Sequence, residues 1–326
     1  MSLLRTPALL LTLLALTGCD GGSAASNGSS NPAAPLCVSS SCGSKTRLVT
    51  IPDAENILFT PAGRLFVSGG TNVFEIGKSG SSYSATPLLA GSCNFTGLTL
   101  RGEVLYANCF DGQLYAARLT AQPQLVPIHS LGLASPNGLA TGPDGELYVV
   151  NGPLATNALP LPKIVRLKLD ASDPMKVLEQ TDWLTLDLLL SQPNGVQIRG
   201  RTLYFSESSA PTQGRIRSVP IDADGSPGTV QTFTSFNSLP DDFSLAGDGL
   251  LATYFSGGQI ALFDASGTLV SATDAMSFDS PSQARLGQPP LFATTDILVT
   301  EKGLLGENDS TIGNVLSVFR PNQLKP

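Results

Sequence analysis

The stretch GLATGPDGELYVVN, residues 138–151, decides the fold of this chain of 326 residues. Two runs of alternating apolar residues flank the turn sequence PDG. A turn of this composition supplies positive backbone φ with little strain and joins two antiparallel strands tightly. The stretch therefore predicts a β-hairpin.

The same pattern recurs along the chain. Further copies are found at 57–68 (ILFTPAGRLFVS), 97–108 (GLTLRGEVLYAN), 195–206 (GVQIRGRTLYFS), 243–255 (FSLAGDGLLATYF) and, more loosely, 284–300 (ARLGQPPLFATTDILVT). A third apolar run follows each hairpin, and a fourth is visible in segments such as LVPIHSL near residue 128. The repeating unit is therefore about four strands long.

One leading position stands just ahead of each hairpin. These six positions are separated by 41, 41, 57, 47 and 41 residues and are occupied by Glu55, Thr96, Asn137, Asn194, Asp241 and Ser282. This spacing with four strands per repeat is typical of a β-propeller, whose blades pack around a central channel. The sequence predicts an all-β, six-bladed β-propeller with four-stranded antiparallel blades, with a β-sandwich or open solenoid as the alternative.

The last repeat ends after VLSVFRP and lacks its outer strand. The segment RLVTIP, residues 47–52, precedes the first repeat and is not needed by it. We expect this N-terminal strand to complete the last blade and close the ring, so that residues 47–326 form the propeller.

The composition agrees with a loop-rich globular domain, with 33 Gly, 24 Pro, 41% hydrophobic residues and 14% charged residues. The net charge is −7, and no cluster of Lys or Arg is present. Nucleic-acid binders carry basic patches, so the sequence argues against such a partner. We expect a monomer that binds a small molecule.

The N-terminus predicts a secreted, anchored protein. Residues 1–18 contain Arg5 and then PALLLTLLALTG, an apolar run of the length of a secretory signal core. Leu16-Thr17-Gly18-Cys19 resembles the lipobox of bacterial lipoproteins, which implies a lipid on Cys19 and a cell-envelope location. Residues 19–46 begin with a stretch rich in Gly, Ser, Ala and Asn and are predicted to be a flexible tether. An ordinary signal peptide with an incidental cysteine is the alternative.

Four cysteines remain after Cys19, an even number in an oxidising compartment, so two disulfides are expected. Cys93 precedes the first strand of the second repeat and Cys109 follows its second strand, which puts both at the same end of adjacent antiparallel strands. Cys37 and Cys42 would then close a small loop. Their spacings do not match those of zinc sites.

The leading positions also predict a metal site. The inner strands of a propeller all start at one rim of the channel, so Glu55, Asn137, Asn194 and Asp241 should converge there. Carboxylate and amide oxygens without histidine or thiolate suit Ca²⁺, although Zn²⁺ and Mn²⁺ remain open as the working metal. Asn and Asp are also common turn residues ahead of strands, but four in register favour a metal site. The uncharged Thr96 and Ser282 are expected to mark the side open to substrate.

Several of these residues resemble a known family. The two Pro-Asn-Gly sequences at 136–138 and 193–195, the Pro-Asp at 240–241 and the Glu ahead of the first repeat are similar to the senescence marker protein/gluconolactonase group, which includes regucalcin. The paraoxonases are more distantly similar. The resemblance covers residues 47–320 and implies a propeller whose central divalent ion is held by a Glu, one or two Asn and an Asp.

The resemblance implies hydrolysis of lactones or other esters, with Glu55, Asn137, Asn194 and Asp241 as the ligand set. The pair Asp241-Asp242 is similar to the acidic pair at the paraoxonase calcium. Two departures are evident: NFTGL lacks the histidine that paraoxonases place there, and Ser135-Pro136 replaces an arginine-bearing segment of regucalcin-like enzymes.

The sequence thus predicts a calcium-dependent hydrolase of a lactone or ester at the channel mouth. The ion would polarise the carbonyl group, and Asp241 or Asp242 would act on the attacking water as the catalytic base. The alternative is a non-catalytic envelope propeller that binds a ligand or protein and keeps a structural ion. A serine-hydrolase triad is disfavoured because the only histidine, His129, lies in an apolar run and no Gly-x-Ser-x-Gly is present.

Three long links between strands are expected on the ligand rim, at 151–162, 206–214 and 301–313. Asn151, Glu207 and Glu301 begin these links and are predicted to line the substrate pocket, with exposed loop polarity as the alternative. Trp183 is expected to pack against a blade.

Overall fold

The computed structural model describes residues 36–89, 93–152, 161–187, 191–210, 212–305 and 307–322. They belong to one unit of the chain, Leu36–Pro326. No helix in the part that the structure describes is long and apolar enough to cross a membrane.

The unit consists of six antiparallel sheets of four strands, and each sheet is one blade. In blades one to five the strands follow one another in sequence order from the channel outward, and in blade six β22, β23 and β24 are followed by the N-terminal strand β1.
Blades one and two contain β2 (Ala54–Phe59), β3 (Leu65–Gly69), β4 (Asn72–Ser79), β5 (Ser82–Pro87), β6 (Phe95–Arg101), β7 (Val104–Cys109), β8 (Gln113–Arg118) and β9 (Val126–Ser130).
Blades three and four contain β10 (Pro136–Thr141), β11 (Leu147–Asn151), β12 (Lys163–Leu169), β13 (Val177–Thr185), β14 (Gln192–Arg199), β15 (Thr202–Ala210), β16 (Gln213–Pro220) and β17 (Gln231–Phe236).
Blades five and six contain β18 (Pro240–Ala246), β19 (Gly249–Tyr254), β20 (Gln259–Phe263), β21 (Leu269–Ala272), β22 (Pro281–Leu286), β23 (Ile297–Glu301), β24 (Val315–Pro321) and β1 (Gly43–Thr50).

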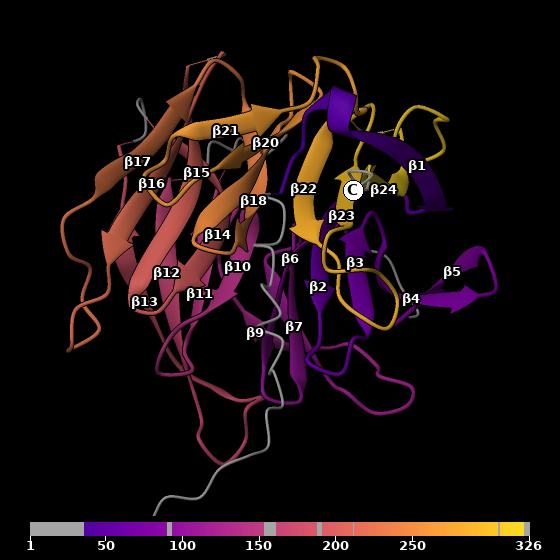
Figure 1. Cartoon of the computed structure of the whole chain (residues 1–326). Helices are drawn as coiled ribbons and strands as arrows, with labels where there is room; N and C mark the ends of the chain where they lie inside the picture. Colours follow the sequence, from indigo (N-terminus) through magenta and orange to yellow (C-terminus); the bar gives the residue numbers. More distant parts are fainter. Residues whose placement is uncertain are drawn as a thin grey trace, which may run out of the picture. The chain divides into compact units, whose positions relative to one another are not determined.

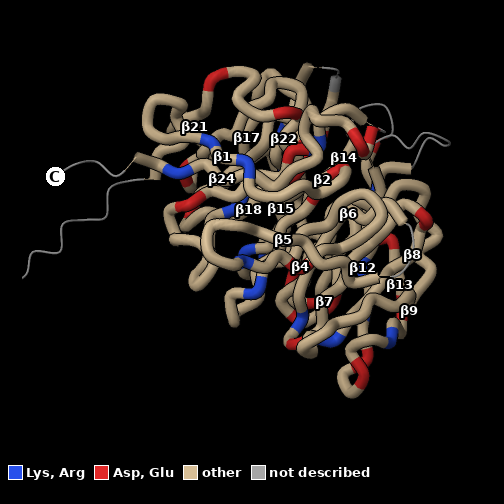
Figure 2. Tube along the Cα trace, turned by 90° about the vertical axis from the view of Figure 1, so that its right-hand side faces the viewer, with Lys and Arg blue, Asp and Glu red and all other residues tan. Residues whose placement is uncertain are grey.

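The blades succeed one another around a ring, and the inner strands β2, β6, β10, β14, β18 and β22 stand side by side at its centre (Figure 1). The predicted six-bladed propeller with four-stranded antiparallel blades is therefore confirmed. Lys and Arg positions are interspersed with Asp and Glu positions along the trace in the view of Figure 2.

The ring is closed by β1, the N-terminal strand, which pairs antiparallel with the C-terminal strand β24 from Gly43↔Pro321 to Thr50↔Val315. The predicted closing strand is confirmed, but it begins at Gly43 rather than at residue 47. Val38 is fully buried beside Phe278, and its N–H donates to Ser271 Oγ at 3.2 Å. The predicted tether, residues 19–46, is therefore too long at its C-terminal end, because residues 36–46 have apolar and β-pairing partners in the propeller. Residues 1–35, including the predicted signal and Cys19, lie outside the described residues.

The hydrophobic core lies between neighbouring blades. Phe66 and Leu58 of blade one pack with Phe95 and Leu105 of blade two in one buried cluster. Another cluster joins blade six to blade one through buried residues such as Leu298 and Leu316. Each buried side chain of this size contributes about 1.5–3 kcal/mol through removal of apolar surface from water, so every blade depends on both its neighbours.

Two further predictions can be compared with the structure. The disulfides Cys37–Cys42 and Cys93–Cys109 are both formed, with Cα–Cα separations of 6.2 and 6.1 Å. The prediction of a long loop over residues 206–214 is wrong, because β15 and β16 continue their pairing as far as Ala210↔Gln213. The alternating residues of SESSA extend the hairpin instead of leaving it.

Candidate functional site at the channel mouth

All six inner strands carry a β-bulge at the same place. In blade one Ala54 pairs with Gly69 and Ile57 with Val67, so Glu55 and Asn56 together face the single residue Ser68. The same shift follows Phe95, Pro136, Pro193, Pro240 and Pro281 in the other blades. The first residue of each bulge is one of the six leading positions. Because a bulge bends a strand and re-aims its side chains, these positions depart together from the ordinary alternation of the sheet.

Hydrogen bonds between blades hold these bulges in place. The residue that faces each bulge is polar in five blades, and its side chain donates to the backbone carbonyl of the leading residue in the next blade. In ring order the pairs are Ser68 to Thr96, Asn108 to Asn137, Ser206 to Asp241, Thr253 to Ser282, and Thr300 to Glu55. The last pair crosses from blade six to blade one, so the leading positions are fixed relative to one another around the ring. In blade three the equivalent residue is Val150, whose side chain has no hydrogen-bond donor.

The second bulge residue explains the Pro-Asn-Gly sequences. A Cβ atom at Gly138 would stand 2.5 Å from the carbonyl oxygen of Asn194 in the next blade. At Gly195 a Cβ atom would overlap the carboxyl group of Asp242. Glycine is required at both positions because neighbouring blades approach so closely.

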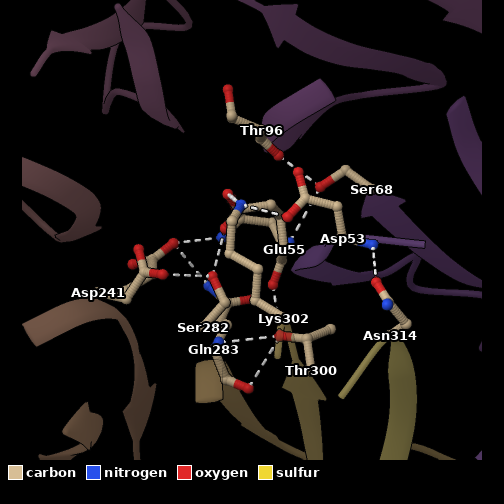
Figure 3. A network of polar contacts seen from close by, with 12 residues as sticks. Asp53, Glu55, Ser68, Thr96, Asp241, Ser282, Gln283, Thr300, Lys302 and Asn314 are labelled. Carbon is tan, nitrogen blue, oxygen red and sulfur yellow. Dashed lines mark hydrogen bonds and ion pairs between the residues drawn. The ribbon is translucent and has the colours of Figure 1, made fainter. Parts of the chain in front are cut away.

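The structure brings Glu55 and Asp241 together through Ser282. The hydroxyl of Ser282 contacts Glu55 Oε2 and lies 2.8 Å from Asp241 Oδ2 (Figure 3). A hydroxyl carries one proton, so it can donate to only one of these carboxyl groups at a time. Ser282 is therefore a bridge between two predicted ligands and does not mark an open side of the site. Thr96, the other uncharged leading residue, is fully buried and donates to Pro136 O at 2.9 Å.

A buried ammonium group stands beside these carboxyl groups. Lys302 Nζ contacts Glu55 Oε1 and lies 3.1 Å from Asp53 Oδ1 (Figure 3). The backbone N–H of Asp53 donates to Asn314 Oδ1 at 2.6 Å, which anchors that segment to the loop after β23. The sequence prediction missed both Lys302 and Asp53. Lys302 follows Glu301 at the end of β23. It lies within the link 301–313, and the unusual length of this link was the one sequence signal that could have pointed to it.

The electrostatics of the cluster follow from burial. Burial raises the pKa of Glu55, although Lys302 works in the opposite direction. Burial and the charge of Glu55 raise the pKa of Asp241 well above its usual range. Burial alone would lower the pKa of Lys302, but the carboxyl groups of Glu55, Asp53 and Asp241 outweigh it and raise that pKa. The lysine is therefore a permanent cation inside an acidic cluster.

A second layer of side chains lies beneath the leading residues. Asp242 Oδ2 accepts from Asn56 Nδ2 and, at 2.9 Å, from Gln283 Nε2, and Oδ1 accepts from the N–H of Phe243 at 2.7 Å. Asn56, Asp242 and Gln283 are the second bulge residues of three blades. Burial raises the pKa of Asp242 to about 7, with the Phe243 and Asn56 donors working against this shift. Both oxygens of Asp242 are thus occupied by protein donors.

The residues present fit a divalent cation. Asn194 Oδ1 is buried without a hydrogen-bond partner among the described residues, an arrangement that normally requires a water or an ion. The four predicted ligands are exposed by only 3% to 9%. The cluster contains four carboxyl groups, those of Asp53, Glu55, Asp241 and Asp242, against two cationic side chains, Lys302 and Arg285. This leaves an excess of two negative charges when all groups are ionised, which matches a divalent ion.

The three predicted substrate residues occupy the same register position in their blades. Each pairs with the residue that comes just before the bulge of the inner strand: Asn151, Glu207 and Glu301. All three are buried. Asn151 binds backbone groups of Ser135 and Leu161.

The two carboxylates have cationic partners. Glu207 pairs with Arg215 and Arg217 at 2.8 Å, and Glu301 pairs with Lys45 at 3.0 Å. These side chains tie loops and outer strands to the blade, and we assign them no role in substrate binding.

The remaining predictions concern packing. His129 lies in the outer strand β9, and its Nε2 is 3.0 Å from Gln180 Oε1. Trp183 is 7% exposed, packs edge-on against Tyr148 and donates from Nε1 to Gly225 O. Both are structural residues, as predicted.

Among solved structures, the fold is similar to a gluconolactonase from Xanthomonas campestris, with a TM-score of 0.62, 19% identity, and coverage of 90% of this chain and 99% of that one. It is also similar to a luciferin-regenerating enzyme, with a TM-score of 0.62, 13% identity, and coverage of 85% and 95%. A calcium-binding protein, regucalcin from Agrobacterium tumefaciens, gives a TM-score of 0.61, 14% identity, and coverage of 85% and 94%. At these identities the likeness shows the six-bladed propeller fold. No family model and no curated protein sequence matches the chain.

We predict that Thr300→Val lowers the free energy of unfolding by about 1–3 kcal/mol, because it leaves the buried carbonyl of Glu55 and the N–H of Gln283 without their partner. Thr300→Ser keeps the hydroxyl and is the matched control. Urea unfolding of both variants measures the difference. Equal stability of the Val and Ser variants would show that the hydrogen bonds between blades do not hold the bulges.

We predict that Lys302→Met destabilises the metal-free protein by about 3–5 kcal/mol, since it leaves buried carboxylates without their cation. Lys163→Met is the control, because Lys163 pairs with Asp182, whose side chain is 56% exposed, and such pairs contribute about 1 kcal/mol or less. Thermal and urea unfolding in the presence of a chelator measure both. A Lys302 variant no less stable than the Lys163 variant would refute a buried ion-pair cluster.

Proposed function

We propose that this propeller is a metal-dependent hydrolase of a lactone or ester, with Ca²⁺ as its ion. The observation that supports the proposal is the contact of Ser282 with both Glu55 and Asp241, together with the unpartnered oxygen of Asn194. The likeness of the fold to a gluconolactonase and to a calcium-binding regucalcin supports the same reading.

Glu55, Asn137, Asn194 and Asp241 would hold the ion. When bound, the ion supplies a positive charge that polarises a carbonyl group and stabilises the negative charge formed on it. Ser282 keeps Glu55 and Asp241 at a fixed separation, and Lys302 holds the second oxygen of Glu55. The protein thus prepares the ligand geometry before any substrate arrives.

Asp241 is the proposed base rather than Asp242. Both oxygens of the Asp242 carboxyl group already accept protein N–H groups, whereas the side chain of Asp241 has only Ser282 as a hydrogen-bond partner among the described residues. Asp242 instead holds the strands beneath the site together.

One observation favours a second candidate, a non-catalytic propeller that binds a ligand or protein. Lys302 already neutralises part of the acidic cluster from within the chain, so an ion could serve the fold alone. Both candidate functions are compatible with the lipid on Cys19, an envelope location and a monomeric state. These three predictions rest on the sequence.

We predict that the protein hydrolyses at least one member of a panel of aliphatic lactones and aryl esters, and that chelation removes this activity. Asp241→Asn and Glu55→Gln each remove one negative ligand at constant shape, so we expect calcium affinity to fall by about 100-fold or more. Asp279→Asn is the control, because this aspartate lies 3.7 Å from Arg47 with its side chain 38% exposed.

Calorimetric titration with Ca²⁺ and product assays on the same samples separate the two candidates. Calcium binding without turnover of any substrate would contradict the hydrolase and support the non-catalytic propeller. Unchanged calcium affinity in both ligand variants would contradict the site itself.

A further inference from the structure

Lys302 stands where the backbone adopts an unusual conformation on several sides. Among the described residues other than glycine, positive φ angles are found at Asp53 (48°), Met276 (60°), Ser280 (50°) and Asn314 (49°). The backbone N–H of Lys302 donates to Ser280 O at 3.0 Å, and its Nζ lies 3.1 Å from Asp53 Oδ1. Asn314 in turn accepts from the N–H of Asp53. Side chains other than glycine rarely adopt this conformation, and such residues are concentrated at functional sites.

The link that follows Lys302 closes on itself. A Cβ atom at Gly313 would stand 2.2 Å from the Cα atom of Gly303, and these two glycines have φ angles of 67° and 76°. The side-chain amide of Asn314 donates to two carbonyl groups of the link, at 2.8 and 3.1 Å. The same asparagine holds Asp53, so the link and the segment before β2 are fixed together. This arrangement determines where the side chain of Lys302 lies.

The ammonium group of Lys302 is shared between two carboxyl groups. Nζ contacts Glu55 Oε1 as well as Asp53 (Figure 3). The three side chains are exposed by 9% or less. An ammonium group between two buried carboxyl groups is charged, because the charged forms stabilise one another. The chain therefore places a cation of its own against one of the proposed calcium ligands.

This contact restricts what Glu55 can offer to an ion. Its Oε2 contacts the hydroxyl of Ser282, which can donate instead to Asp241 Oδ2 at 2.8 Å and so release Oε2. Its Oε1 contacts Lys302, whose ammonium group can only donate and stays on an acceptor. Glu55 thus has one oxygen for an ion, whereas calcium sites often use both oxygens of a glutamate.

Lys302 also reduces the negative charge of the cluster. The affinity of a calcium site depends on the charge of its ligands, and a cation beside a ligand cancels part of that charge. The lost oxygen and the lost charge both act against the ion. A lysine that only supported the shape of the site would have the opposite effect, because its removal would weaken ion binding. The sign of the effect therefore distinguishes the two roles.

We propose that Lys302 is a built-in cation that shares Glu55 with the bound ion, limits this glutamate to one ligand oxygen and lowers the calcium affinity of the site. In the absence of an ion, the same ammonium group holds the acidic cluster together. The inference rests on the ion of the proposed function, but not on hydrolysis or on any substrate. Since Lys302 acts through Glu55, it is a positioning residue.

The test is a calorimetric titration of the whole protein and its variants with Ca²⁺. Lys302→Met removes the charge and keeps an unbranched side chain, and we expect it to bind calcium at least about tenfold more tightly than the wild-type protein. Lys302→Arg keeps a positive charge beside Glu55 and should bind calcium about as weakly as the wild-type protein. Lys163→Met is the control and should leave the affinity unchanged, because Lys163 pairs with Asp182 on the outer strands of blade three.

Thermal unfolding with and without Ca²⁺ provides a second readout. A tighter complex gains more stability at saturation, so calcium should raise the unfolding temperature of Lys302→Met more than that of the wild-type protein. If this variant does not fold without calcium, Lys302→Gln replaces it. The amide of glutamine can still donate to Glu55 but carries no charge, so this variant should also bind calcium more tightly.

The outcomes separate this inference from the proposed function. Equal or weaker calcium binding by the folded Met and Gln variants, with binding intact in the wild-type protein, would overturn the inference and leave the calcium site in place. An Arg variant that binds as tightly as the Met variant would overturn it too, because the charge would then have no effect. Absence of calcium binding in the wild-type protein and in every variant would overturn the inference and the calcium site together.

Discussion

The candidate site depends on one backbone constraint, the bulge at the start of every inner strand. A single extra residue stands at the same register in all six inner strands, so the six leading residues lie at the same end of the ring. Side chains of the second strands then fix the carbonyls of these residues across five of the six junctions between blades. The positions of Glu55 and Asp241 are thus determined by the closure of the whole ring rather than by their own blades.

The second constraint is charge. Four carboxyl groups are gathered in a region with little access to water, which is unfavourable unless cations or protons compensate them. The chain supplies part of the compensation itself, through Lys302 and Arg285, from the loop after β23 and from β22. The remainder is available to a bound ion at the mouth.

Much of the fold was predictable from the sequence because the hairpins repeat with a regular period and each carries its own turn signal. The orphan strand near residue 47 and the register of the leading residues also followed from counting. What the sequence could not show was the bulge, which leaves no composition signal beyond the glycines at 97, 138 and 195. Lys302 was missed because a lysine in a polar loop is normally exposed, and only the ring closure brings it beside Glu55. Asn151, Glu207 and Glu301 were predicted at the pocket because they are polar at strand ends, whereas their register position turns them to partners within the blade.

The most direct test of the central claim is a crystal structure of the protein soaked with Mn²⁺ in place of Ca²⁺, with anomalous diffraction used to locate the metal. We predict a single anomalous peak at the channel mouth, coordinated by Glu55, Asn137, Asn194 and Asp241, with Lys302 still paired to Glu55. A channel mouth without an anomalous peak, in crystals whose leading residues are ordered, would contradict it.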